Sequence, residues 1–91
     1  MNETVMQKEM SEMHKKVLLE NIERIHTTEM GVARISKNLG IEGDVVKYCI
    51  LKLENDESEV SKKGKNYYVE VDEEIITINS SSFTIITAHK K

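Results

Sequence analysis

The stretch SEVSKKGKNYYVEVDEEIITINSSSFTIITAH, residues 58–89, decides the fold. Apolar and β-branched residues alternate with polar ones along it, a pattern that predicts half-buried strands. Three short polar breaks, at 63–65, near 72–74 and at 80–82, divide it into strands at 58–62, 66–72, 75–79 and 83–88. Connections this short can join only antiparallel neighbours. The sequence therefore predicts a four-strand antiparallel meander.

The residues before this stretch follow a helical period instead. Apolar side chains recur at intervals of three and four residues near the N-terminus, which predicts one amphipathic helix over residues 1–25. Its apolar positions are Met6, Met10, Met13, Val17, Leu18, Ile22 and Ile25. The stripe is longer than a three-helix core needs, so a homodimer through this helix is one expected partnership.

Two shorter helices are predicted within residues 27–55. Thr27 or Thr28 before Glu29 forms a good helix start, and Gly40 is placed to end that helix. Asp44 opens the next helix, which ends near Asn55. The expected core positions are Met30, Val32, Ala33, Ile35 and Leu39 in the first of these helices and Val45, Val46, Cys49, Ile50 and Leu53 in the second. The fold class is α+β, with three helices packed on the sheet in one domain of residues 1–91.

Composition narrows the classes of function. Among 91 residues, 16 Asp and Glu outnumber 13 Lys and Arg, so the net charge is −3. This balance gives no general attraction for phosphate backbones and makes duplex DNA an unexpected partner. No apolar run approaches the roughly 20 residues of a membrane span, and the first residues lack a secretory signal. We therefore expect a cytoplasmic protein with no membrane association.

Metal and cofactor sites are not expected. His14, His26, His89 and Cys49 show none of the spacings typical of zinc sites. The four glycines form no phosphate-binding loop. Cys49 lies in an apolar helical run and is expected to be a core residue.

Five residues are candidates for metal-free chemistry: His26, Arg34, Lys65, Thr87 and His89. Histidine titrates near neutral pH, so His26 and His89 are the acid–base candidates for cleavage of RNA by its own 2′-hydroxyl. Cationic side chains would stabilise the charge that develops on phosphorus. The lysines at 62–65 are expected to approach the C-terminal lysines and form a basic mouth. Structural roles stay open: a capping or packing role for His26, an ion pair for Arg34 and solubility for Lys65.

Three segments carry a resemblance. HTTEMGVARISKNL at 26–39, KGKNYYVEV at 63–71 and ITINSSSFTIITAHK at 76–90 resemble a small bacterial and phage-associated domain family of unassigned function. More distantly, helices followed by a four-strand meander look like the fold shared by barnase, EndoU, tRNA-cleaving colicins and RelE-type toxins. The distant resemblance implies a toxin-like ribonuclease and places His26, Arg34, Lys65, Thr87 and His89 in its site. The chain departs from a typical ribonuclease in being acidic, and fold alone does not confer function.

Whether the chain is an enzyme stays open at this point. The leading hypothesis is a metal-independent, ribonuclease-like domain acting on RNA. One alternative is a small inhibitor of phage or mobile-element origin that offers its acidic surface to a basic protein partner. Another is a winged-helix DNA-binding module, for which two or three paired strands would be expected instead of four.

Overall fold

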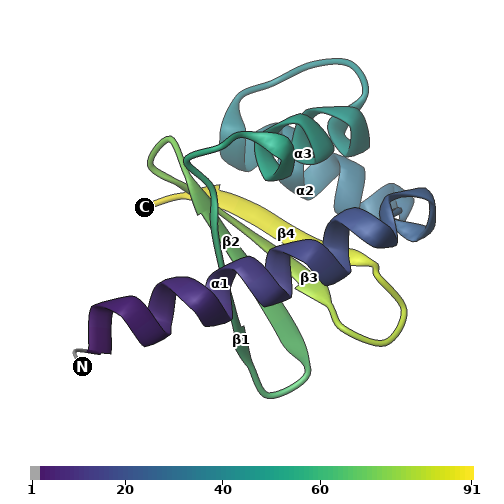
Figure 1. The fold of residues 1–91 in the computed structure, drawn as a ribbon. Helices are drawn as coiled ribbons and strands as arrows, with labels where there is room; N and C mark the ends of the chain where they lie inside the picture. Colours follow the sequence, from purple (N-terminus) through teal and green to yellow (C-terminus); the bar gives the residue numbers. More distant parts are fainter. Residues whose placement is uncertain (1–2) are drawn as a thin grey trace.

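The computed structural model describes the backbone of residues 3–91 and the side chains of residues 9–91. The first two residues and the Met6 side chain, both assigned above to the first helix, lie outside that description. The elements follow in the order α1 (Glu3–Glu20), η1 (Ile22–Arg24), α2 (Glu29–Leu39), α3 (Val45–Glu54), β1 (Glu59–Lys63), β2 (Asn66–Val71), β3 (Glu74–Asn79) and β4 (Ile85–Lys90). Figure 1 shows the three α-helices preceding the sheet along the chain. The predicted α+β class is confirmed.

The four strands form one antiparallel sheet in sequence order, as predicted. Register places Val60, Val69, Ile76 and Ala88 side by side across it, and all four are buried. Because side chains alternate between the faces of a strand, the neighbouring row of Ser61, Tyr68, Thr77 and Thr87 lies on the other face. Four paired strands contradict the winged-helix alternative.

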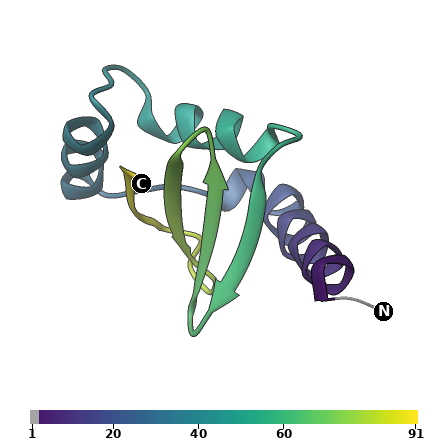
Figure 2. The same ribbon diagram turned by 90° about the vertical axis from the view of Figure 1, so that its left-hand side faces the viewer.

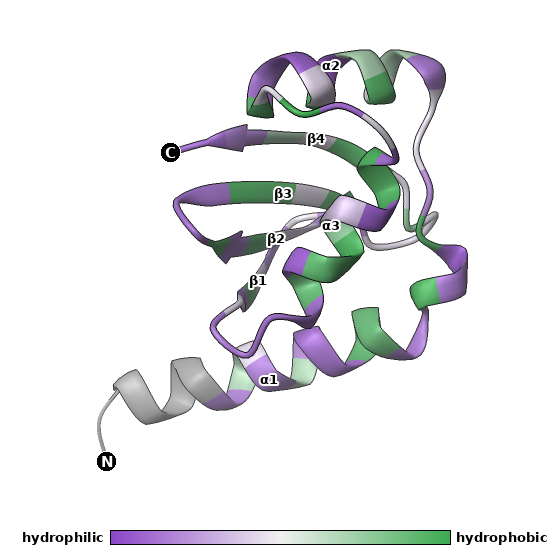
Figure 3. Ribbon diagram, turned by 90° about the horizontal axis from the view of Figure 1, so that it is seen from above, coloured by the Kyte–Doolittle hydropathy of each residue, from purple (hydrophilic) through white to green (hydrophobic). Residues whose placement is uncertain are grey.

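The helices cover one face and both edges of this sheet. Figure 3 shows α3 over the strands, α2 beside β4 and α1 beside β1. Figure 2 shows the same arrangement of the three helices around the sheet from another side. At the β1 edge, the Val60 amide donates to Ser11 Oγ at 2.8 Å. At the β4 edge, Asn38 Nδ2 donates to the Ala88 carbonyl at 3.2 Å. Helix side chains thus occupy strand-edge groups that would otherwise be open to pairing with another chain.

Local signals set the ends of α2 and α3 as predicted. Thr28 caps α2 by accepting a hydrogen bond from the Gly31 amide, and Asp44 caps α3 by accepting one from the Lys47 amide. Gly40 ends α2 with a φ of 66°, a conformation that glycine adopts without the strain a side chain adds. The core joins these helices to the sheet through Leu18, Ile35, Leu39, Val45, Cys49, Leu53, Ile76 and Ile85, among others.

The expected continuous helix over 1–25 is wrong at its C-terminal end. The α-helix stops at Glu20, and the Asn21 side chain donates back to the Val17 carbonyl at 2.8 Å. The chain then makes the 3₁₀ turn η1, which redirects it so that Ile25 becomes buried. An unbroken helix would carry Ile25 along the α1 axis, away from the sheet.

Several apolar positions assigned to the core are exposed. Met10 and Met13 of α1 are 55% and 68% exposed, and Met30 of α2 is 72% exposed. In α2 the buried residues are Gly31, Ile35 and Leu39, which recur at four-residue intervals along one narrow face. Val32 and Ala33 point away from that face and are also exposed. The hydrophobic period predicted the helix correctly, but only part of its apolar face is buried against the sheet.

The last strand begins later than predicted. Phe83, expected as its first residue, has a φ of 58° and belongs to the turn, while its side chain is buried as expected. The strand β4 runs from Ile85 to Lys90, so His89 lies inside it instead of after it. Of the residues described, no helix is long and apolar enough to span a bilayer.

Candidate functional site

Positive charge gathers at one end of the sheet. The register joins Lys63 to Asn66 and Asn66 to Asn79, so the β1–β2 and β3–β4 turns lie at the same end. The turns also touch, because the Ser80 amide donates to the Lys65 carbonyl at 2.8 Å. We call Arg24, His26, Lys63 and Lys65 the basic rim.

Arg24 reaches the rim from η1. Its Nη2 donates to the Ser81 carbonyl at 3.3 Å, and its guanidinium lies 4.6 Å from the centre of the Phe83 ring. Buried Phe83 thus gives the arginine a fixed aromatic surface, since a cation is attracted to the face of an aromatic ring. The remainder of the guanidinium stays exposed to solvent. Sequence reasoning missed Arg24, although it lies two residues before a histidine that was singled out.

The backbone of His26 is held against β4. His26 and Thr84 form an isolated parallel bridge, in which the Ile85 amide donates to the His26 carbonyl at 2.7 Å and the His26 amide donates to the Phe83 carbonyl at 3.3 Å. The imidazole itself is exposed. The backbone of His26 is therefore fixed while its ring remains accessible to solvent.

Two contacts orient the ring. His26 Nδ1 lies 2.7 Å from the Arg24 carbonyl oxygen, and Nε2 lies 3.1 Å from Thr84 Oγ1. A carbonyl oxygen can only accept, so Nδ1 carries a hydrogen. In the neutral ring Nε2 then carries the lone pair, which can accept from the Thr84 hydroxyl. The lone pair needed for general-base chemistry is thus on the nitrogen beside the β3–β4 turn.

A short chain of hydroxyl groups supports this orientation. Thr84 Oγ1 lies 2.7 Å from Ser82 Oγ. The turn that carries Ser82 is fixed by Asn79, whose Oδ1 accepts from the Ser81 and Ser82 amides at 2.9 Å each. The polar tripeptide predicted as a plain turn therefore positions a hydrogen-bond chain that ends on His26. Thr84 was missed because its link to His26 spans 58 residues of sequence.

Two of the five predicted site residues lie at the same end of the sheet. His26 and Lys65 lie at the same end of the sheet, through their contacts with the β3–β4 turn. His89 is five residues beyond Thr84 on β4, which places it about 16 Å away at the usual rise per strand residue. Thr87 contacts Asn38 of α2 at 3.4 Å, and Arg34 is exposed within α2.

The expected basic mouth of the 62–65 lysines and the C-terminal lysines is wrong. Register pairs Lys90 with Glu74, and the Lys91 amide donates to the Glu73 carbonyl at 2.9 Å. The C-terminus therefore lies beside the acidic β2–β3 turn, at the opposite end of the sheet. In a four-strand meander the first and third turns share one end, while the second turn and the C-terminus share the other.

Residues 19–89 match the model of a family described as Protein of unknown function (DUF3781). The chain belongs to the DUF3781 family. No curated protein and no solved structure matches it significantly. Membership confirms the coarse part of the resemblance, a small domain family without an assigned function, while the distant relation to ribonucleases stays a prediction. The DUF3781 segment contains the whole basic rim, whereas α1 up to Leu18 precedes it.

A second polar cluster of this DUF3781 protein lies between α3 and the β2–β3 turn. The Tyr48 hydroxyl lies 3.0 Å from both carboxylate oxygens of Glu74, which is 8% exposed, and Lys52 pairs with Asp72 at 2.8 Å. Burial, followed by the hydrogen bond to Glu74, raises the pKa of Tyr48. Burial also raises the pKa of the neighbouring Cys49 thiol to about 12, so this cysteine is an unreactive core residue as predicted.

Tyr48→Phe should lower the free energy of unfolding by about 1–2 kcal/mol, because it leaves a buried carboxylate without its donor. Urea denaturation followed by circular dichroism measures the loss. Tyr68→Phe is the matched control, since no hydrogen bond of the Tyr68 hydroxyl is found among the described residues, and its stability should be unchanged. Equal stability of Tyr48→Phe and wild type would contradict a structural role for this pair.

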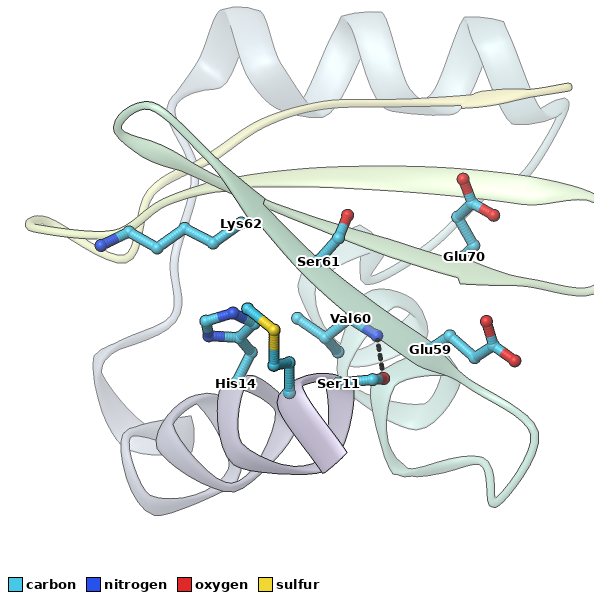
Figure 4. A pocket seen from close by; sticks show the side chains of 8 residues that line it. Ser11, His14, Glu59, Val60, Ser61, Lys62 and Glu70 are labelled. Carbon is cyan, nitrogen blue, oxygen red and sulfur yellow. Dashed lines mark hydrogen bonds between the residues drawn. The ribbon is translucent and has the colours of Figure 1, made fainter. Parts of the chain in front are cut away.

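A groove of about 380 Å³ separates α1 from β1 (Figure 4). It is lined by Met10, Ser11, His14, Glu59, Val60, Ser61, Lys62 and Glu70. The His14 and Tyr67 rings pack with centres 5.6 Å apart, and Ser11 receives the Val60 amide. These contacts attach α1 to β1 through Ser11 and to β2 through His14, so we assign the groove a structural role. Among the described residues, no group of three or more His, Cys, Asp or Glu side chains is arranged to hold a metal ion.

Proposed function

We propose that this DUF3781 protein is a metal-independent ribonuclease-like domain that binds the phosphate backbone of RNA at the basic rim. The observation that carries the proposal is the orientation of His26, whose Nε2 faces Thr84 beside the β3–β4 turn, the same turn that contacts the Arg24 guanidinium and the Lys65 backbone. A base beside a phosphate-binding cluster is what cleavage by the RNA 2′-hydroxyl requires. The candidate site therefore comprises the rim and the Thr84 and Ser82 hydroxyl groups.

The reaction needs no group beyond the RNA, the rim and water. His26 Nε2 removes the proton of a 2′-hydroxyl, which replaces Thr84 as its hydrogen-bond partner. The 2′-oxygen attacks phosphorus, and the bond from phosphorus to the 5′-oxygen breaks. The 5′-oxygen takes a proton from water, and the hydroxide that remains takes back the proton held by His26, so the products end in a 2′,3′-cyclic phosphate and a 5′-hydroxyl. Arg24 and Lys65 stabilise the negative charge that grows on the phosphate oxygens.

The open sheet face offers the rest of the binding surface. Asn66 and Asn79 pair across β2 and β3 next to the rim, and Tyr68 follows two residues further along the same face. Tyr67 is buried while Tyr68 is half-buried, so Tyr68 is the tyrosine available to stack on an unpaired base. Glu59 and Glu70 face each other in the adjoining row and limit the favourable surface to a few nucleotides. This arrangement favours single-stranded RNA.

Binding of a short fluorescent single-stranded RNA, followed by anisotropy at several salt concentrations, tests the proposed surface. The double substitution Lys63→Glu/Lys65→Glu should weaken binding and lower the salt slope by about 1.4, the value expected for two lost phosphate contacts on a single strand. Lys37→Glu/Lys47→Glu, on exposed positions of α2 and α3, makes the same charge change away from the rim. Equal weakening by both pairs would show that overall charge, instead of the rim, governs binding.

A further inference from the structure

The helix α1 has two distinct sides. The side facing the body carries Ser11, His14 and Leu18, of which Leu18 is fully buried. A second stripe, next to the first around the helix, carries Met10, Met13 and Val17, which are 55%, 68% and 37% exposed. Figure 3 shows α1 lying along the β1 side of the sheet, where the rest of the chain contacts it from one side. Large apolar side chains are thus left in contact with solvent.

The spacing of this stripe is that of a coiled-coil seam. Positions 10, 13 and 17 alternate intervals of three and four residues, the a and d positions of a heptad. No comparable seam is needed for the fold, because Leu18 and Ser11 already attach α1 to the sheet. The segment of α1 before Leu19 also lies outside the DUF3781 match. The exposed seam therefore lies outside the segment that matches the family.

Charged residues beside the seam identify its occupant. Glu9 and Lys16 are seven residues apart and occupy the same heptad position, on one flank of the methionines. If two copies of α1 lie antiparallel with Met10 opposite Met13 of the other copy, each Glu9 faces the other copy's Lys16. In a parallel pair this flank would face His14 and Asn21, with no such ion pairs. The charges beside the seams of two copies are therefore complementary in the antiparallel orientation.

We propose that α1 is a dimerisation helix, which pairs antiparallel with α1 of a second copy through Met10, Met13 and Val17. Two symmetric Glu9–Lys16 pairs fix the orientation, as expected for an interface with twofold symmetry. The apolar contact is short, so the dimer is reversible and forms with increasing protein concentration. The proposal does not depend on the activity of the basic rim.

Sedimentation equilibrium over a range of protein concentrations tests the dimer. Wild type should approach twice the 10.5 kDa mass of one chain. Met13→Glu should remain monomeric with an unchanged circular dichroism spectrum, since the side chain is exposed in the monomer. Met30→Glu is the matched control, because Met30 is equally exposed on α2. A monomeric wild type, or equal dimerisation of both variants, would overturn the proposal.

Charge reversal tests the orientation. Glu9→Lys and Lys16→Glu should each raise the dimer dissociation constant about tenfold, because each replaces two attractions by two repulsions. The double variant Glu9→Lys/Lys16→Glu should restore wild-type dimerisation, since each pair is rebuilt with its charges exchanged. A double variant weaker than both single variants would rule out the antiparallel arrangement.

Discussion

His26→Ala should lower the rate of RNA cleavage by about a hundredfold or more, the usual cost of losing a general base. RNA binding should be retained, because Arg24, Lys63 and Lys65 still hold the phosphates. Single-turnover cleavage of a single-stranded RNA, measured with a saturating excess of protein, separates these two effects. The backbone bridge to Thr84 involves no side-chain atom of His26, so the fold should survive the substitution.

His89→Ala is the matched control for that prediction. It removes a second exposed histidine, about 16 Å along β4 from Thr84, and should leave both binding and cleavage unchanged. If His89→Ala lost as much activity as His26→Ala, the rim would be the wrong site. Thr84→Val should have a smaller effect than His26→Ala, because it removes the group that orients the ring and leaves the base in place.

Gly31→Ala should lower the free energy of unfolding by about 2 kcal/mol, although alanine is a better helix former than glycine. A Cβ at this position would collide with Thr27 Oγ1 and lie 3.3 Å from Thr27 Cβ. Thr27 must then rotate and give up its 2.8 Å hydrogen bond to the Ile85 carbonyl on β4. Since Thr27 follows His26 directly, the same movement should disturb the candidate base.

A double-mutant cycle with Thr27→Ala identifies the cause of that loss. In the Thr27→Ala background the colliding oxygen is absent, so Gly31→Ala should become neutral or stabilise by up to about 1 kcal/mol through helix propensity. Urea denaturation of the four proteins provides the free energies. If Gly31→Ala lowered the free energy of unfolding equally in both backgrounds, contact with Thr27 would not be the cause of the loss.

Local sequence signals predicted most of the fold. The strands were predicted from the alternation of neighbouring residues. Thr28, Gly40 and Asp44 set the helix ends through local φ angles and hydrogen bonds, which do not depend on distant contacts. Burial was harder to predict. The hydrophobic period shows which face of a helix is apolar, but it does not show how much of that face the neighbouring element covers. Met30 is exposed for that reason, and Met10 and Met13 are exposed because α1 meets the sheet through a different stripe.

The candidate site was only partly predictable. Strand direction alone separates Lys65 from Lys90, because successive turns of a meander alternate between its ends, and this placement could have been obtained by counting strands. The link between His26 and Thr84 could not, since a bridge across 58 residues has no local signal. Arg24 lies over the ring of Phe83, a residue with a left-handed φ that the alternating pattern assigned to an ordinary strand.

Cleavage of a DNA oligonucleotide that contains a single ribonucleotide, in the presence of EDTA, is the sharpest test of metal-independent RNA cleavage by this protein. We expect one cut on the 3′ side of the ribonucleotide, with a 2′,3′-cyclic phosphate on one product and a 5′-hydroxyl on the other. The same oligonucleotide with a 2′-deoxy sugar at that position should stay intact. No cut in the ribonucleotide substrate, or an equal cut in the all-deoxy one, would contradict RNA cleavage at the basic rim.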